Sequence, residues 1–242
     1  MGPLYQEMLL LLACSIDPAP PDVDGLAHWT WVNYDIADED ALIEASDILR
    51  GFEDDDGIIT DLQPEELAHL GLDGGELDGT RGWYVVNRFS CDIDALTSAL
   101  VDLNQDTWRE YESYSRSYTG DRDAFDAGET DVLTWDTDYA AKYVTATYTC
   151  HSTGGVRRVG DTLQARTWFR EPCGSDDEDY TWNQDYQNEF YVVDGGEIVH
   201  LYSMWREIQA AGLDQGDDGL VNIMQNGMRD WDDTTAEACL DF

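Results

Sequence analysis

Residues 187–205 read QNEFYVVDGGEIVHLYSMW, two alternating runs joined by the pair Gly195-Gly196. A Gly-Gly pair supplies the positive φ angles that a two-residue hairpin turn requires. This turn pairs Val193 with Ile198 and Val192 with Val199, which fixes the register of the hairpin. One face is apolar and carries Phe190, Val192, Val199, Leu201 and Trp205. The other face is amphipathic and carries Glu189, Tyr191, His200 and Tyr202.

A helical pattern follows at 220–238, where apolar residues recur at spacings of three and four. We expect this helix to cover the apolar face of the hairpin. Phe190, Val192, Leu201 and Trp205 are therefore predicted to face Met224, Met228 and Trp231. Tyr148, Ala165 and Phe169 are expected to contribute from neighbouring strands, and these ten residues are the candidate lining of a ligand cavity.

The composition indicates a folded, acidic protein. The 242 residues include 52 acidic and 13 basic side chains, for a net charge of -39, with nine Trp, thirteen Tyr and six Phe. So many aromatic residues exclude a disordered acidic chain. The charge excludes nucleic acid as a partner, because nucleic-acid binding requires a basic surface. An acidic excess of this kind is typical of a solvated, salt-tolerant surface.

The remaining patterns predict an α+β fold for residues 81–242. A helical segment is expected at 93–110, and strands are expected at 83–89, 111–118, 132–138, 143–150 and 163–170, before the hairpin. The predicted order is one strand, a helical segment, a meander of antiparallel strands and a long C-terminal helix.

This order resembles the helix-grip fold of the START and Bet v 1-like superfamily. In that fold a curved antiparallel sheet wraps the last helix, and the space between them often holds a lipid, a sterol or another apolar molecule. The resemblance covers about residues 83–242 and rests on element order, so it transfers no residue role. It implies an apolar ligand between the sheet and the C-terminal helix by analogy.

The N-terminal segment resembles a bacterial lipoprotein signal. Leu11-Leu12-Ala13-Cys14 is similar to a lipobox, in which cleavage before a cysteine accompanies lipidation of that cysteine. The resemblance implies a signal peptide over 1–13, a lipid on Cys14 and a proline-rich tether over 14–27. Ser15 resembles an outer-membrane sorting signal, so we expect an outer-membrane anchor with the body in the periplasm. Residues 1–7 depart from the pattern because they lack Lys and Arg. The alternative is a leucine-rich segment on a cytosolic protein.

The cysteine count agrees with export. Without Cys14, the four residues Cys91, Cys150, Cys173 and Cys239 can form two disulfides in three ways. We favour Cys150 with Cys173, at the ends of adjacent strands, and Cys91 with Cys239, which would attach the last helix to the start of the fold. No pair has the spacing of a zinc site, so neither a metal nor a cofactor is predicted.

Residues 28–80 are predicted to form a small N-terminal helical appendage. Trp29, Trp31 and Tyr34 alternate like a short strand, residues 38–49 read as a helix, and residues 64–70 read as a second short helix with proline in its first turn. Acidic, glycine-bearing loops are expected at 53–57 and 71–79. The acidic runs at 54–57 and 214–219 lack the ligand pattern of an EF-hand and are interpreted as solvated turns.

No catalytic residue is predicted, and the chain is not expected to be an enzyme. His28, His69, His151 and His200 are scattered, and the sequence has no Gly-x-Ser-x-Gly elbow or phosphate-binding glycine loop. We interpret His200 as part of a polar and aromatic cluster with Tyr191 and Tyr202.

The expected function is that of an exported, lipid-anchored, non-catalytic envelope protein that binds an apolar small molecule or a lipid. One alternative is a structural or interaction lipoprotein with a filled core, and a more distant one is a hydrolase that uses acidic residues. A cavity of about 300 Å³ or more beneath the last helix would favour the binding protein. Convergent carboxylates in a cleft would favour the hydrolase. The sequence predicts no oligomeric state.

Overall fold

The computed structural model describes residues 16–72, 77, 79–143, 145–209 and 217–242. Cys14 and the predicted signal peptide lie outside these residues, as does the first half of the acidic run at 214–219. None of the helices described is both long and apolar enough to cross a membrane.

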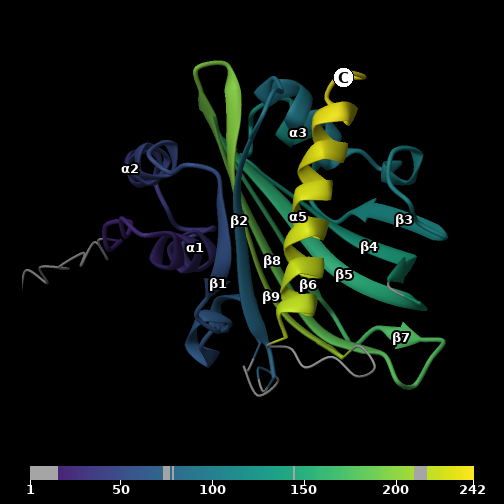
Figure 1. Cartoon of the computed structure of the whole chain (residues 1–242). Coiled ribbons are helices and arrows are strands. Elements are labelled where there is room, and N and C mark those ends of the chain that lie inside the picture. Colours follow the sequence, from purple (N-terminus) through teal and green to yellow (C-terminus); the bar gives the residue numbers. More distant parts are fainter. Residues whose placement is uncertain (1–15, 73–76, 78, 144, 210–216) are drawn as a thin grey trace, which may run out of the picture.

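Nine antiparallel strands of the described chain form one sheet in the order β1-β2-β9-β8-β6-β5-β4-β3, with β7 paired to β5 (Figure 1). Their bounds are β1 Asp55–Ile59, β2 Arg81–Phe89, β3 Ser113–Tyr118, β4 Val132–Tyr143, β5 Ala146–Val159, β6 Thr162–Phe169, β7 Gly174–Ser175, β8 Thr181–Asp194 and β9 Glu197–Gln209. Because β2 pairs with β9, the first strand of the predicted α+β region lies beside the last one.

Helices cover both faces of this sheet. They are α1 Val23–Val32, α2 Glu39–Arg50, α3 Ile93–Val101, α4 Arg122–Asp126 and α5 Asp218–Ala238, with short 3-10 helices η1 Pro64–Glu66, η2 Ala68–Leu70 and η3 Gln105–Thr107. Figure 1 shows α5 lying along one face, and α1 and α2 on the other side of β1 and β2. The fold is therefore α+β, with an antiparallel sheet gripping a long C-terminal helix and a small N-terminal helical appendage, as predicted.

Aspartates begin the first four α-helices. The side chains of Asp22, Asp38, Asp92 and Asp121 each accept a hydrogen bond from a backbone N–H in the first turn of the helix that follows. These bonds satisfy N–H groups that have no partner inside the helix.

The predicted hairpin is confirmed in register and in turn. Val192 pairs with Val199 and Val193 with Ile198. Gly195 and Gly196 have φ angles of 63° and 97°, in the left-handed region that glycine adopts without steric cost.

Successive side chains of β8 and β9 point into different cores. The face covered by α1 and α2, here called the appendage face, carries Phe190, Val192, Leu201 and Trp205. The face covered by α5, here called the grip face, carries Tyr202 and Met204 together with Met224 and Met228 of α5.

The sequence assigned the wrong face to α5. Phe190, Val192, Leu201 and Trp205 do not face Met224, Met228 and Trp231, but pack against the appendage. The physical reason is that α1 and α2 bring their own large apolar side chains, among them Leu26, Trp31, Leu42 and Leu49, to the more apolar side of the hairpin. The amphipathic helix α5 packs against the amphipathic side.

The N-terminal region differs from the prediction in three places. Trp29 and Trp31 belong to α1 rather than to a strand. This helix is buried on most of its circumference, so its sequence lacks the polar periodicity by which an amphipathic helix is recognised. Helix α1 begins at Val23, and Trp29 Nε1 donates to the Asp17 carbonyl at 2.7 Å, so the segment expected as a tether over 14–27 already contacts the body. Residues 55–59, expected in part as an acidic loop, form β1 at the edge of the sheet.

Both favoured disulfides are present in the described residues. Cys91 is bonded to Cys239, which directly follows α5, and Cys150 on β5 is bonded to Cys173, which precedes β7. The first bridge fixes the C-terminal end of α5 beside the start of α3.

Candidate functional site

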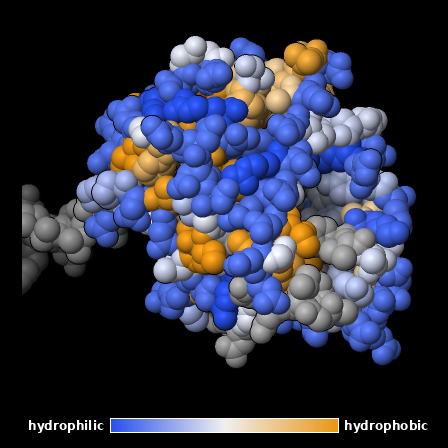
Figure 2. Space-filling model, viewed as in Figure 1, coloured by the Kyte–Doolittle hydropathy of each residue, from blue (hydrophilic) through white to orange (hydrophobic). Residues whose placement is uncertain are grey.

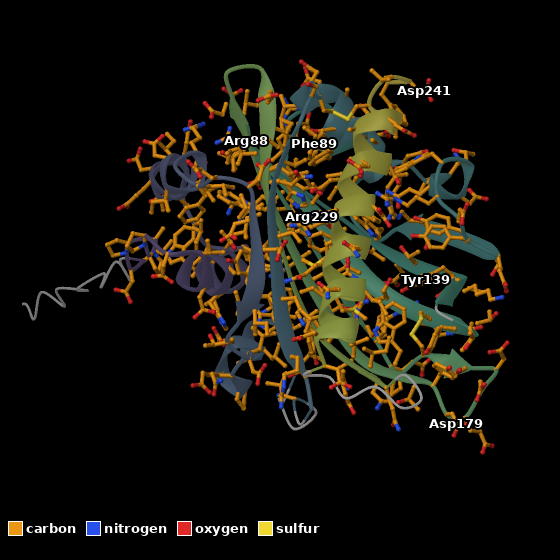
Figure 3. The ribbon with its side chains drawn as sticks, viewed as in Figure 1. Arg88, Phe89, Tyr139, Asp179, Arg229 and Asp241 are labelled. Atoms are coloured by element: carbon orange, nitrogen blue, oxygen red, sulfur yellow. A yellow bond between two sulfur atoms is a disulfide. The ribbon has the colours of Figure 1, made fainter. Side chains whose placement is uncertain are left out.

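A cavity of about 100 Å³ lies between α5 and the grip face, and we call it the chamber. Figure 3 shows Tyr139, one of its walls, on β4 beside α5. Strands β3, β4, β5, β6 and β8 supply most of the lining, α3 and η3 supply Leu100 and Gln105, and α5 supplies Trp231. The lining residues are Leu100, Gln105, Tyr111, Tyr114, Arg116, Trp135, Thr137, Tyr139, Ser152, Ala165, Thr167, Gln187, Glu189 and Trp231.

An open groove of about 680 Å³ lies outside the chamber, between α5 and residues 108–111. Tyr111 and Trp231 line both spaces. Arg109 lies over the Trp231 ring, with its guanidinium carbon 2.9 Å from the ring centroid, and donates to Thr235 Oγ1 at 2.9 Å. Burial lowers the pKa of Arg109 to about 10, although nearby tyrosines and Glu189 act in the opposite direction. Because Trp231 lines both spaces and Arg109 covers its ring, these two side chains separate the groove from the chamber.

Glu189 is the one carboxylate among the described residues that line the chamber. Its Oε2 accepts hydrogen bonds from Trp231 Nε1, at 2.8 Å, and from the Tyr191 hydroxyl. The side chain is almost completely buried, and this burial raises the pKa of its carboxyl group although His200, Tyr191 and Arg109 favour the ionised form. The site thus contains a carboxylate held in place by two donors.

His200 lies behind Glu189, away from the chamber lining. Its Nδ1 is 2.7 Å from Asp232 Oδ1, and its ring stacks on Tyr191 with a centroid distance of 3.8 Å and on Tyr202 at 5.4 Å. Asn87 donates to the other oxygen of Asp232 at 3.2 Å. The interpretation of His200 as part of a polar and aromatic cluster is confirmed, and the cluster also includes Asp232 of α5.

A buried ion pair supports the opposite side of the chamber. Arg206 binds Asp185 through two hydrogen bonds of 3.0 Å each. Gln187, which lines the chamber, donates to Asp185 at 2.6 Å and accepts from the Tyr202 hydroxyl at 2.6 Å. A two-point Arg–carboxylate contact has a fixed geometry, so this pair holds Gln187 in one orientation.

The predicted lining residues divide into three groups. Ala165 and Trp231 line the chamber, whereas Tyr148, Phe169, Met224 and Met228 lie on the grip face in the apolar core beside it. Phe190, Val192, Leu201 and Trp205 belong to the appendage face and cannot touch a ligand in the chamber.

Most of the chamber wall was not predicted from the sequence. Tyr111, Tyr114 and Tyr139 come from different strands or loops, and only the strand order brings them together. Asp232 does not belong to the apolar pattern of α5, yet it is fully buried because His200 and Asn87 supply hydrogen-bond partners. The sequence feature that could have located the site was the occurrence of Glu189 and His200, two ionisable residues, on the same face of a central hairpin.

No protein-family model matches the sequence, and no curated protein matches it. Solved structures with a similar fold include human STARD10, with a TM-score of 0.43 and 10% identity over 76% of this chain and 82% of that chain. The Zhui aromatase/cyclase from Streptomyces has a TM-score of 0.41 and 11% identity over 67% and 92% of the two chains. A STAR-related lipid transfer protein from Xanthomonas axonopodis has a TM-score of 0.38 and 11% identity over 72% and 98%. Similarity at this level assigns no ligand and no residue role to this chain.

Proposed function

We propose that this chain is a non-catalytic binding protein that holds a small, mainly apolar molecule in the chamber beneath α5. The observation that carries the proposal is the chamber itself, a space walled by aromatic rings and lying next to an open groove. Apolar walls with a few fixed polar groups are the usual composition of a small-molecule site.

The size of the chamber limits the ligand. Its volume of about 100 Å³ is below the roughly 300 Å³ of sites for drug-sized molecules, and below the roughly 150 Å³ of an apolar cavity that binds benzene. A long acyl chain would require Trp231 and Arg109 to move, so that the chamber and the groove join. The structure as it stands favours a molecule of only a few non-hydrogen atoms.

Binding is favoured over hydrolysis by the number of carboxylates. A hydrolase that relies on acidic residues needs two carboxyl groups facing the same substrate, as in glycoside hydrolysis. Glu189 alone faces the chamber among the described lining residues, and Asp232 is directed toward His200 and Asn87.

We also propose that the protein is exported and anchored to the outer membrane through a lipid on Cys14, with its body in the periplasm. The lipobox-like Leu11-Leu12-Ala13-Cys14 supports the anchor. The pairing of the other four cysteines supports export, because disulfides persist in oxidising compartments. We expect a bacterial host to incorporate labelled fatty acid into the wild type and not into Cys14→Ser. Unlabelled wild-type protein in the soluble fraction would contradict the anchor.

Ligand binding is tested by native mass spectrometry of protein purified from its own source, which we expect to carry a co-purifying small molecule. Ala165→Leu fills the chamber and should abolish this mass. Ala45→Leu, an equal change in the appendage core, should keep it, although either change costs about 1–3 kcal/mol of stability. A wild type that is repeatedly empty would favour the structural lipoprotein instead.

A further inference from the structure

One oxygen of Glu189 is open to a ligand. Oε2 accepts both hydrogen bonds to this side chain, from Tyr191 and Trp231, and no described residue donates to Oε1. The residue is 4% exposed and lines the chamber. Oε1 is not one of the fully buried polar atoms without a partner in the described residues, so it is accessible from the chamber, and a molecule there that donates to Oε1 would gain a charge-assisted hydrogen bond.

The carboxylate also lacks a cation within hydrogen-bond distance. His200 Nε2 is 3.8 Å from Glu189 Oε2, and His200 already binds Asp232 through Nδ1. Arg109 donates to Thr235, and Arg116 donates to the Leu100 and Asp102 carbonyls and to Gln105. A cation in the chamber would therefore meet a carboxylate whose one ion-pair contact among the described residues, His200 at 3.8 Å, is not a hydrogen bond.

The chamber walls are suited to a positive charge. Tyr111 packs on Tyr114 with a centroid distance of 4.8 Å and on Tyr139 at 5.4 Å. Arg116, itself a lining residue, lies over the Trp135 ring at 4.4 Å, and Arg109 lies over the Trp231 ring, so these two ring faces are already occupied and the tyrosine rings remain for a ligand. Aromatic faces attract cations through the ring quadrupole, most strongly where water is excluded.

The groove outside the chamber also favours positively charged molecules. Four of its described lining residues are acidic, namely Glu110, Asp230, Asp233 and Glu237, and one, Arg109, is cationic. A concave surface lined mainly by one sign of charge concentrates ions of the opposite sign and raises their rate of entry. Figure 2 shows that the face of the molecule carrying α5 is mostly hydrophilic, with separate hydrophobic patches.

We propose that the ligand of the chamber is a small organic cation, a primary or N-methylated ammonium ion that keeps at least one N–H, bound between the Glu189 carboxylate and the tyrosine rings of the lining. This inference rests on the proposed function, because it names the class of molecule that the chamber holds. The ammonium group faces Oε1, and its alkyl groups fill the apolar part of the lining.

Isothermal titration calorimetry with the full mature chain tests the proposal, at constant ionic strength. tert-Butylammonium is the cation, and tert-butanol is a neutral probe of the same shape and the same number of non-hydrogen atoms. We expect tert-butylammonium to bind at least about 10-fold more tightly than tert-butanol. Glu189→Gln should remove this preference, and Tyr111→Leu should weaken binding of the cation more than that of the alcohol.

The matched control is Glu207→Gln, which removes the same charge from β9 at a residue outside the chamber lining. It should leave the affinity for tert-butylammonium within about twofold, and urea unfolding should show that each variant is folded. Equal binding of the two probes, or an unchanged preference in Glu189→Gln, would overturn the cation proposal. A co-purifying neutral molecule would also overturn it while leaving the proposed binding function intact. Binding of neither probe, combined with an empty native protein, would overturn both.

Discussion

The two faces of the sheet are covered by helices of different character. On the appendage face, α1 and α2 bury a large apolar core, in which Asn188 donates to Thr30 at 2.7 Å, and the buried Arg166 pairs with Asp35 at 2.6 Å at its edge. On the grip face, α5 buries Asp232 against His200, close to Glu189, and the chamber lies beside them. The appendage face is therefore mainly a packed core, whereas the grip face has ionisable groups beside the chamber.

The attachment of the helices differs in the same way. Helix α5 is linked covalently through Cys91–Cys239, and Cys150–Cys173 also lies at the grip face. Among the described residues, α1 and α2 are held to the sheet by contacts and hydrogen bonds. Helix α5 also contributes Leu220, Met224 and Met228 to the apolar core of the grip face, so the covalent link adds to its packing.

The largest expected effect is the loss of the Cys91–Cys239 bridge. This disulfide spans 148 residues and the other spans 23. The chain-entropy model gives a cost of about 5 kcal/mol for replacing the long bridge by two serines and about 3 kcal/mol for the short one. Urea unfolding of Cys91→Ser/Cys239→Ser and of Cys150→Ser/Cys173→Ser measures both costs.

Hydrogen exchange then locates the effect of the long bridge. Amides of α5 should exchange faster in Cys91→Ser/Cys239→Ser, whereas amides of α1 and α2 should be unchanged until global unfolding. Equal acceleration on both faces would show that the two coverings are not independent.

Truncation of a tryptophan on each face compares the packing directly. Trp205 is fully buried on the appendage face, and Trp205→Ala should cost about 3–5 kcal/mol. Trp231 is partly exposed beside the chamber and the groove, so Trp231→Ala enlarges an existing space and should cost less. Chemical denaturation gives both values, and a larger loss for Trp231→Ala would contradict the contrast between the faces.

The pH dependence of stability tests the charge buried on the grip face. Burial raises the pKa of Glu189 in the folded protein, so the folded state binds this proton more tightly than the unfolded chain. Stability is therefore lost as pH rises from the ordinary carboxyl range through the folded pKa, by at most about 1.4 kcal/mol per pH unit for one proton. Glu189→Gln should lack this loss and gain stability relative to the wild type as pH rises.

The stability of Glu189→Gln is subtracted from that of the wild type at each pH. This difference removes the contributions of His200, Asp232 and Arg109 to the pH dependence where the variant leaves these residues unchanged. A difference between the two proteins that does not vary between pH 4 and pH 8 would refute the raised pKa.

The smallest expected effect is the pH dependence of stability that His28 contributes on the appendage side. Burial lowers the pKa of His28, but the hydrogen bond and charge of Glu66, the Thr60 carbonyl and Asp24 together raise it above 6.5. The resulting stabilisation is complete below pH 6.5 and is lost as pH rises through the folded pKa. His28→Gln should lack it, as measured by thermal unfolding between pH 5 and pH 9. Because the site is half-buried, solvent screening keeps this effect smaller than that of Glu189.

Sequence patterns were sufficient for elements whose structure depends on local residues. Gly195-Gly196 determined the turn and register, and the spacing of Leu220, Met224 and Met228 located α5. The covering of each face could not be predicted in this way, because ten of the thirteen residues of β9 are buried and both of its faces are covered. Contrast between the two faces of a strand shows which is more apolar, but not which helix lies on it.

The long disulfide also has a consequence for the order in which the molecule matures. Cys239 follows α5, so its bond to Cys91 cannot form until nearly the whole described chain has been synthesised and exposed to an oxidant. The sheet and the appendage can assemble earlier, while the grip face is still uncovered. A molecule that enters at this stage would meet an open site, and closure of the bridge would then slow its escape. Formation of the last covalent bond would thus act as a kinetic step in loading.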